Sequence, residues 1–183
     1  MVEAGSTPEN IVLVGFMGSG KSSIGRSIAK RLGFQFVDTD QLVIERTGRV
    51  IARIFAEDGE EAFRNLETRV LESLQHLRRC VIATGGGAVL RAENRALMRR
   101  LGFVVCLTAS EEVTFQRVSR NAKRPLLQTP DPRQTLRDLL AERRDFYQDA
   151  AQFTLDTTPL SQPEAAEVIM REARKAFSWQ REE

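Results

Sequence analysis

The sequence contains few of the residues that characterise disulfide-rich, zinc-binding or membrane-spanning proteins. Its 183 residues include two cysteines, one histidine, one tryptophan and one tyrosine. Cys80 and Cys106 stand in apolar segments, CVIA and VVCL, where reduced thiols buried in strands are expected. No cysteine or histidine has metal-ligand spacing, and no apolar run approaches the length of a membrane span. These absences argue against a disulfide framework, a Cys/His zinc site and a transmembrane helix.

A strong charge of either sign is also lacking. Lys and Arg together number 27, Asp and Glu number 25, and the net charge is +2. A binder of nucleic acid or of membrane surfaces needs a concentrated positive field, so neither partner is expected. The first ten residues, MVEAGSTPEN, have neither the basic nor the apolar region of a secretory signal. We therefore expect a cytoplasmic monomer that acts on small molecules.

Length and hydropathy patterning indicate one domain built on an open, parallel α/β sheet. The chain has room for one substantial core and little room for a second. Short apolar segments alternate with longer amphipathic ones, and uninterrupted apolar segments are typical of strands buried on both faces. Strand–helix alternation of this kind places helices on both faces of the sheet. The predicted strands are Ile11–Gly15, Gln35–Val37, Cys80–Ala83, Phe103–Leu107 and Phe153–Leu155.

The longer segments carry helix signals, and one segment lacks them. The clearest helix is predicted for Glu60–Leu77, where apolar residues recur at steps of three and four. Gly33 has the position of a helix C-cap, and Ser110 that of an N-cap. Arg120–Arg133 contains three prolines and several basic residues, which disfavour a long helix. An irregular segment of this length predicts a functional lid, with disorder as the alternative.

The first predicted strand leads directly into a phosphate-binding loop. Gly15–Ser22 (GFMGSGKS) matches the pattern G-x-x-x-x-G-K-[ST], with IVLV before it and an amphipathic segment after it. The glycines let main-chain N–H groups surround a phosphate, and the following helix directs its positive end at the anion. Lys21 is expected to reach the β- and γ-phosphates, and Ser22 to ligate Mg²⁺. Because the sequence has no guanine-reading Asn-Lys-x-Asp, a small kinase is the economical interpretation.

Two carboxylates follow the second predicted strand, in Asp38-Thr39-Asp40. Residues two apart in extended backbone project to the same side, and ligands of open α/β sheets bind beyond the carboxyl ends of strands. A kinase needs one carboxylate for Mg²⁺ and another to orient the acceptor hydroxyl or take its proton. The alternative is that Asp38 or Asp40 only caps the next helix. No acidic residue ends the third predicted strand, so Asp38 is the best candidate for the metal and Asp40 for the acceptor.

Five motifs, in this order and spacing, resemble the shikimate kinase family over about residues 10–160: GFMGSGKS, DTD, IFAEDGEEAFRNLE, ATGGGAV and KRPLL. The resemblance implies a three-layer α/β P-loop kinase fold of the nucleoside-monophosphate-kinase type, with five parallel strands in the order 2-3-1-4-5. It implies transfer of the γ-phosphoryl group of Mg·ATP to the 3-hydroxyl of shikimate, giving shikimate 3-phosphate and ADP. We expect one domain over residues 1–183, with tails at 1–9 and 177–183, an acceptor-binding helical region at about 39–70 and a lid at about 118–132.

On the acceptor side, the resemblance implies two arginines that bind the shikimate carboxylate. Arg64 can offer a planar fork to a carboxylate and is within reach of Glu67 on the same helix, although an exposed Arg–Glu pair is the alternative. Arg143 lies in ERRDFY, where Asp145 replaces the family's proline; Arg144 is the less favoured choice. The implied acceptor-binding residues are Asp40, Phe55, Phe63, Arg64, Gly85, Gly86 and Arg143.

On the nucleotide side, the resemblance implies contacts from the phosphate loop, the lid and the helix before it. Arg124 in KRPLL is expected to contact the ATP phosphates, with Lys123 and Arg120 as lesser candidates, and Arg117 is expected to pack against adenine. The implied nucleotide-binding residues are Gly18, Ser19, Gly20, Lys21, Ser22, Ser23, Arg117 and Arg124. The implied catalytic residues are Lys21, Asp40 and Arg124, and the implied Mg²⁺ ligands are Ser22 and Asp38.

Two other functions stay open at the level of the sequence. A sister kinase for gluconate or a nucleoside monophosphate would share the loop and the lid, but it is not expected to combine Asp40, Arg64 and Arg143. A catalytically silent relative that binds ATP as a regulatory module would be signalled by loss of Lys21, Asp38 or Asp40. All three of these residues are present.

Overall fold

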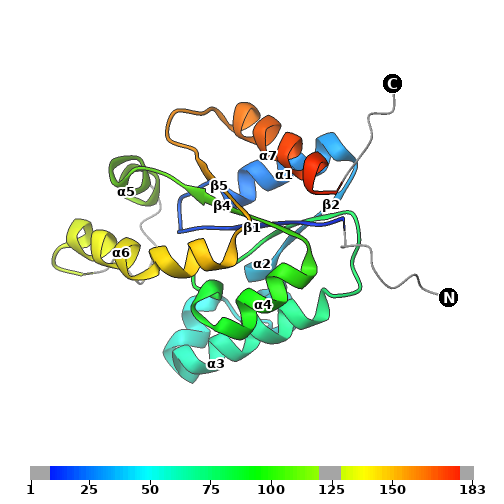
Figure 1. Ribbon diagram of the computed structural model, residues 1–183. Coiled ribbons are helices and arrows are strands. Elements are labelled where there is room, and N and C mark those ends of the chain that lie inside the picture. The colour runs from blue at the N-terminus through cyan, green and yellow to red at the C-terminus, as the bar shows by residue number, and fades with distance from the viewer. Residues whose placement is uncertain (1–8, 120–128, 178–183) are drawn as a thin grey trace.

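The computed structural model describes residues 9–119 and 129–177 of the protein. At its centre lies a five-stranded sheet with the order β2-β3-β1-β4-β5, in which every neighbouring pair is parallel (Figure 1). The strands are β1 (Ile11–Val14), β2 (Gln35–Asp38), β3 (Cys80–Ala83), β4 (Phe103–Thr108) and β5 (Phe153–Asp156). The expected fold class and strand order are confirmed, and each strand boundary lies within one residue of its prediction.

The three central strands owe their place to continuous apolar sequence. Every residue of β1 and β3 is buried, as is β4 except for Thr108. Helices on both faces of a parallel sheet leave no solvated side, which explains why polar residues do not alternate there. The edge strands β2 and β5 are partly exposed. The prediction of strands buried on both faces is therefore right for the centre of the sheet and wrong for its edges.

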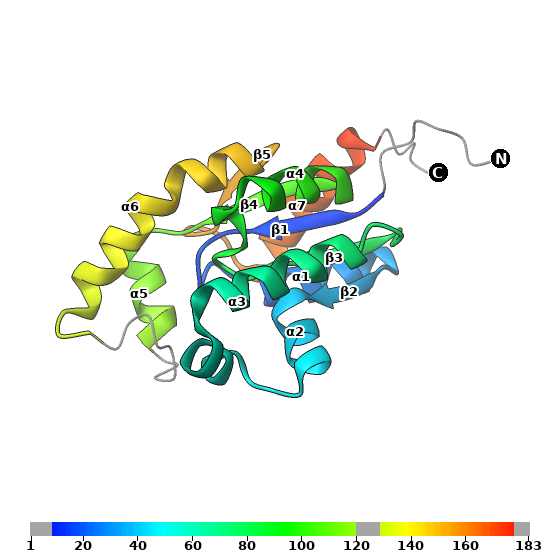
Figure 2. The same ribbon diagram turned by 90° about the horizontal axis from the view of Figure 1, so that it is seen from below.

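Helices cover the two faces of the sheet in separate layers (Figure 1). One layer contains α1 (Lys21–Leu32) and α7 (Gln162–Ala176); the other contains α3 (Ile51–Ser73), α4 (Ala92–Leu101) and α6 (Pro132–Ala150). Because successive strand residues face opposite sides, Ile11 and Leu13 pack in the first layer, and Val12 and Val14 in the second. The remaining elements are α2 (Thr39–Thr47), the 3₁₀ helix η1 (Ala88–Leu90) and α5 (Glu111–Ser119). Figure 2 shows α5 and α6 extending beyond one end of the sheet.

Local helix signals are confirmed at caps, and one predicted boundary is wrong. Gly33 ends α1 in the left-handed conformation with φ 66°, and the Ser110 hydroxyl accepts a bond from the N–H of Val113 before α5. The helix predicted for Glu60–Leu77 is the part of α3 that follows a kink at Gly59 with φ 84°, so its predicted start is right; α3 as a whole begins at Ile51 and ends at Ser73, before the predicted end. Leu74 is buried and Leu77 packs on the same core. The apolar periodicity thus outlasts the helix because a turn continues its core contacts.

The structure makes the predicted lid and the predicted C-terminal tail shorter than expected. Helix α5 continues to Ser119, and α6 begins at Pro132 after Asp131, which accepts a bond from the N–H of Gln134 at 3.0 Å. Residues 118, 119 and 132 therefore belong to helices. Phe177, expected in a tail, packs edge-on against Phe103 with ring centroids 6.3 Å apart. Within the described residues, no helix combines the length and apolarity needed to cross a bilayer.

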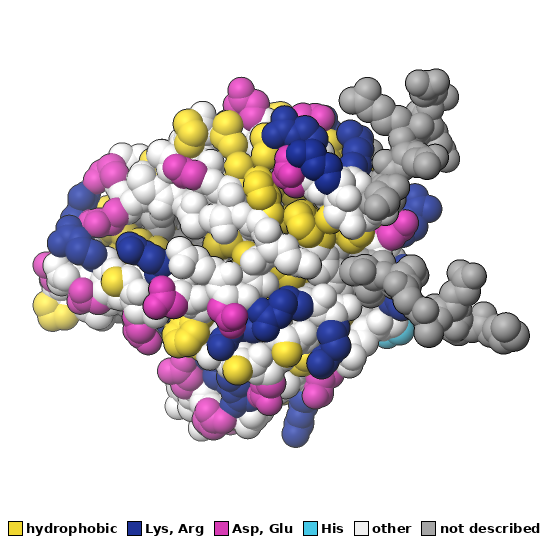
Figure 3. Space-filling model, viewed as in Figure 1, with side chains coloured by type: hydrophobic (Ala, Val, Ile, Leu, Met, Phe, Trp, Pro, Cys, Tyr) yellow, Lys and Arg dark blue, Asp and Glu magenta, His cyan; other side chains and the backbone are white. Residues whose placement is uncertain are grey.

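Charged side chains of both signs are interspersed on the face shown in Figure 3. Charged side chains also pair across elements: Arg137 and Arg133 on α6 bind Glu111 and Glu112 on α5 at 2.9 and 2.8 Å. Such exposed pairs contribute little individually to stability. The mixture of positive and negative side chains leaves the face in Figure 3 without an extended field of one sign, in agreement with the balanced composition.

Candidate active site

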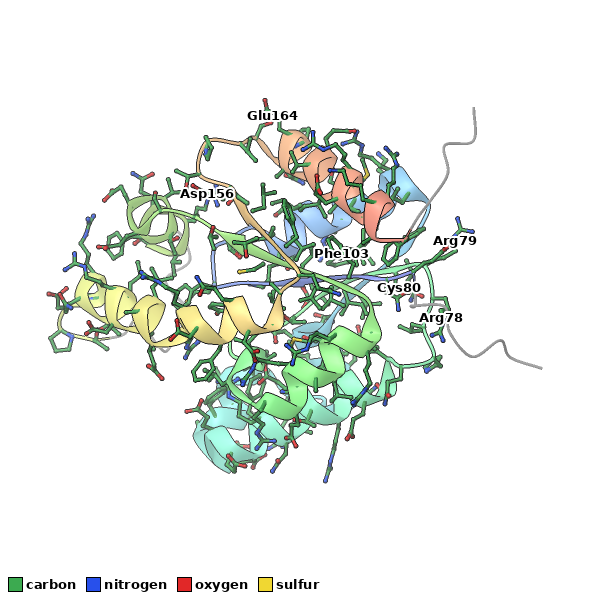
Figure 4. The ribbon with its side chains drawn as sticks, viewed as in Figure 1. Arg78, Arg79, Cys80, Phe103, Asp156 and Glu164 are labelled. Carbon is green, nitrogen blue, oxygen red and sulfur yellow. The ribbon has the colours of Figure 1, made fainter. Side chains whose placement is uncertain are left out.

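The residues highlighted by the sequence gather at the end of the sheet where the strands finish. In Figure 4, Cys80 and Phe103, which start β3 and β4, lie at the end of the sheet opposite Asp156, which ends β5. The phosphate loop follows β1, the two aspartates follow β2, and Gly85–Gly87 (the glycine loop) follows β3. In a parallel sheet these segments share one edge, where ligands of open α/β folds bind. A cleft of about 480 Å³ opens there.

The phosphate loop presents an anion site at the start of α1. Gly20 is the N-cap with φ 99°, no side chain caps the helix, and its first turn contains no acidic residue. The main-chain N–H groups at this end are therefore available to a ligand. Lys21 Nζ donates to the carbonyls of Gly15 at 2.8 Å and Phe16 at 3.0 Å, which places the ammonium group against the loop. Of the predicted contacts in the phosphate loop and the start of α1, those that line the cleft are Gly18, Gly20, Lys21, Ser22 and Ser23.

Ser19 stands apart from the other predicted phosphate-loop contacts. Its side chain is buried, its N–H donates to the Phe16 carbonyl at 3.2 Å, and it borders a second cavity rather than the cleft. Ser19 therefore contributes to the conformation of the phosphate loop from the side away from the cleft. Arg117 on α5 does line the cleft, where it donates to the Gly18 carbonyl at 3.3 Å and the Thr157 hydroxyl at 3.5 Å. Arg124 lies outside the described residues.

The segment after β5, to which the sequence assigned no side chain, contributes to the same cleft. Thr157 is buried and donates to the Thr108 carbonyl at 2.9 Å, and Leu160 forms a further part of the wall. The only signal for these residues is their place in the sequence, because they directly follow a strand at the ligand-binding edge of the sheet. The local sequence carries no recognisable motif of its own.

Asp38 caps α2, as one of the two alternatives expected, and also contacts the phosphate loop. Its Oδ1 caps α2 by accepting from the N–H groups of Asp40 at 3.1 Å and Gln41 at 3.4 Å. Its Oδ2 accepts from the Ser22 hydroxyl at 2.9 Å, beside the phosphate loop. A hydroxyl and a carboxylate oxygen together form a hard donor set that suits Mg²⁺, which usually takes further oxygens from phosphate and water. The residues present therefore fit a magnesium ion.

Arg64 on α3 is buried among carboxylates and aromatic rings. Its guanidinium binds Glu67 at 2.5 Å and Glu60 at 2.8 Å, while only 6% of the residue is exposed. The same group lies 5.9 Å from the ring centroid of Phe55 and 5.4 Å from that of Phe63. The predicted Arg64–Glu67 pair is confirmed, and the alternative of an exposed surface pair is wrong. The two aromatic rings and the two carboxylates together hold the guanidinium in one orientation.

The glycine loop passes between these charged groups at very close range. A side chain on Gly85 would collide with the carboxylates of Asp40 and Glu67, and one on Gly87 would collide with the guanidinium of Arg64. The missing side chains are therefore what allows the backbone to run between the three charged groups. Asp40 and Gly86 also line the cleft described above, so this charged cluster adjoins that cleft.

The second predicted arginine also faces inward. Arg143 on α6 is 5% exposed while Arg144 is exposed, so the favoured arginine of the two is the buried one. Arg143 Nε is buried and finds no hydrogen-bond partner among the described residues. Asp145 lies on the exposed side of α6, and the helix continues through it.

Two hydroxyls near the glycine loop were not predicted. The Tyr147 hydroxyl donates to the Gly86 carbonyl at 2.6 Å, and the Thr39 hydroxyl accepts from the Gly85 N–H at 3.0 Å. Tyr147 carried a signal in the sequence, because it follows Arg143 by one helical turn and so shares its face. Thr39 carried none beyond its place between two aspartates.

Burial raises the pKa of the Glu67 carboxyl to about 7; Arg64 opposes the shift and Asp40 adds to it. Since the unfolded carboxyl titrates near 4.5, the folded state holds its proton more tightly between these values. Unfolding free energy should therefore fall as pH rises from about 4.5 to 7, by about 3 kcal/mol from this group. Urea unfolding over this pH range should show a shallower dependence in Glu67→Gln. Equal slopes in wild type and Glu67→Gln would contradict the assignment.

Comparison with known proteins agrees with this geometry. The family model described as shikimate kinase matches residues 17–174. A shikimate kinase from Symbiobacterium thermophilum is 48% identical over 91% of this chain and 97% of its own, and one from Thermodesulfovibrio yellowstonii is 44% identical over 90% and 94%. The solved structure of Acinetobacter baumannii shikimate kinase in complex with shikimate superposes with a TM-score of 0.87 at 41% identity, covering 92% of this chain and 94% of that one. The chain belongs to the shikimate kinase family and is an ATP-dependent kinase.

Proposed function

We propose that this chain transfers the γ-phosphoryl group of Mg·ATP to the 3-hydroxyl of shikimate through the residues gathered at the cleft. One observation carries the assignment of roles: two buried arginines, Arg64 and Arg143, come from different helices and both interact with Glu67, whose carboxylate lies beside the glycine loop and Asp40. Burying a cation is costly, and a buried N–H without a partner adds roughly 1–3 kcal/mol. A carboxylate ligand removes this cost. The geometry therefore favours an anionic acceptor over a neutral polyol.

The nucleotide half of the site follows from the phosphate loop. Main-chain N–H groups at the start of α1 and the Lys21 ammonium bind the phosphates. Ser22 and Asp38 would hold Mg²⁺, which supplies neutralisation of phosphate charge when bound. Arg117 completes the wall of the cleft, and Arg124 is proposed to reach the phosphates from the lid.

The acceptor half follows from the charged cluster. Arg64 and Arg143 bind the carboxylate of shikimate, while Phe55 and Phe63 wall the pocket. Asp40 accepts a hydrogen bond from the 3-hydroxyl and orients its oxygen toward the γ-phosphorus. As the new O–P bond forms, the bond to the β–γ bridging oxygen breaks, ADP leaves and the hydroxyl proton passes to the Asp40 carboxylate.

An acceptor panel tests this proposal. Coupled ADP release is measured with Mg·ATP and, separately, shikimate, gluconate and nucleoside monophosphates. We expect turnover with shikimate and background rates with the others. Turnover with gluconate or a nucleotide alone would assign the site to a sister kinase, and turnover with none would favour a regulatory ATP-binding protein.

Arg64→Lys should raise the KM for shikimate on the order of tenfold, with the KM for ATP unchanged. A lysine keeps the charge but cannot offer a planar fork to the substrate while also binding Glu60 and Glu67. Steady-state kinetics with each substrate varied in turn gives both constants. Arg91→Lys is the matched control, because Arg91 binds Glu61 from outside the cluster. An unchanged KM for shikimate would remove Arg64 from the pocket.

A further inference from the structure

The glycine loop is held from two sides by hydroxyls that have no role in the proposed reaction. We infer that Thr39 and Tyr147 are positioning residues, which fix the glycine loop relative to Asp40 and Arg143; this inference rests on the proposed function. Thr39 is 2% exposed and bonds Gly85 at 3.0 Å, and Tyr147 is 6% exposed and bonds Gly86 at 2.6 Å. Burial raises the pKa of Tyr147, so its hydroxyl stays protonated and donates at neutral pH.

These two bonds satisfy main-chain groups of the glycine loop that the turn into η1 does not use. The Gly85 carbonyl accepts from the N–H of Ala88 and the Gly87 carbonyl from that of Leu90, both at 3.1 Å, in the turn of η1. Thr39 and Tyr147 satisfy the Gly85 N–H and the Gly86 carbonyl. In the part of the chain that the structure describes, the N–H groups of Gly86 and Gly87 have no acceptor, which leaves two donors for a ligand. Because the loop has no side chains, its bonds to neighbouring elements set where these donors lie.

The Thr39 bond couples the loop to the acceptor-orienting carboxylate. Thr39 is the first residue of α2 and directly precedes Asp40, while Asp38 caps the same turn. Gly85, its partner, lies against the Asp40 carboxylate. The bond therefore ties the backbone that carries Asp40 to the loop that lies beside its carboxylate. Loss of the hydroxyl should disturb the alignment of the acceptor oxygen, and so lower kcat more than it raises KM.

The Tyr147 bond couples the same loop to the carboxylate-binding end. Tyr147 and Arg143 are four residues apart, so they share the buried face of α6. Gly86, the partner of Tyr147, is followed by Gly87, which lies against Arg64. The bond therefore fixes the distance between the arginine of α6 and that of α3. Loss of the hydroxyl should weaken binding of the acceptor carboxylate by the two arginines. It should therefore raise the KM for shikimate more than it lowers kcat.

Thr39 is tested with Thr39→Ser and Thr39→Ala. Both variants lack the γ-methyl group and differ from each other only in the hydroxyl. We expect Thr39→Ser to keep kcat within about twofold of wild type and Thr39→Ala to lose about tenfold, with the KM for ATP unchanged. Thr47→Ala removes a hydroxyl bonded to Val43 at the other end of α2 and should have wild-type kinetics. Equal kcat in the Ser and Ala variants would overturn the role of Thr39.

Tyr147→Phe removes only the hydroxyl on the other side of the loop. We expect the KM for shikimate to rise about fivefold, kcat to change less than twofold and the KM for ATP to stay constant. Parallel rises in both KM values, or no change, would overturn the role of Tyr147. Thermal unfolding is recorded for each variant, and a variant that does not fold would show that its hydroxyl serves stability instead. The wild-type acceptor panel separates the two hypotheses: failure there rejects the proposed function, whereas wild-type turnover with indifferent variants rejects only the positioning role.

Discussion

Asp40→Asn should lower kcat for shikimate phosphorylation by roughly 10²–10³-fold while nucleotide affinity stays near that of the wild type. The amide has the size of the carboxylate and leaves the main-chain bond from Asp40 to Asp38 in place. What is lost is the negative charge and the ability to take a proton from the acceptor hydroxyl. In the proposed site, nucleotide binding depends on the phosphate loop, Ser22 and Asp38, which the substitution does not alter. Calorimetric titration with Mg·ADP and initial rates with shikimate measure the two quantities separately.

The matched control is Asp145→Asn, the same chemical change at an exposed position of α6. It should alter neither kcat nor nucleotide affinity. It also tests whether the aspartate that replaces the family's proline has any part in turnover. An Asp40→Asn enzyme with undiminished kcat would show that another group orients the acceptor, and the proposed role of Asp40 would fall.

The fold could be predicted from the sequence because its determinants are local and redundant. Apolar runs defined β1, β3 and β4, and cap residues such as Gly33 and Ser110 marked helix ends. The end of α3 was missed because Leu74 and Leu77 keep contact with the core after the helical hydrogen bonds stop. Hydropathy reports burial, and burial continues through a turn as readily as through a helix.

The site could be predicted less completely, because its geometry depends on pairs that are distant along the chain. The aspartates, Lys21 and the arginines stand in motifs, so their places could be named in advance. The bonds from Thr39 to Gly85 and from Tyr147 to Gly86 span 46 and 61 residues, and no periodicity encodes them. Capping of α2 and a place at the phosphate loop were presented as a choice for Asp38, because a one-dimensional pattern cannot show that its two oxygens face different partners.

Arg143→Met should raise the KM for shikimate by roughly 10- to 100-fold with a smaller effect on kcat. A charge-assisted hydrogen bond contributes about 1.5–3 kcal/mol, and methionine fills similar volume without charge or donors. The variant should remain folded, because methionine fills the buried space, although it loses the interactions of Arg143 with the Tyr147 hydroxyl and the Phe16 ring. A raised KM for shikimate together with a cooperative unfolding transition is a combination that general misfolding cannot produce. Urea unfolding and steady-state kinetics on one preparation measure both.

Arg144→Met provides the closest control, since it makes the same substitution one residue further along α6 at an exposed position. Its KM for shikimate should lie within about twofold of the wild-type value. An acceptor analogue with a hydroxymethyl group in place of the carboxylate gives the sharper test. If Arg143 binds that carboxylate, as proposed, wild type and Arg143→Met should use the analogue with similar KM values. If the substitution weakens the analogue as much as shikimate, Arg143 shapes the pocket without binding the carboxylate, and the preference for an acidic acceptor must come from Arg64 alone.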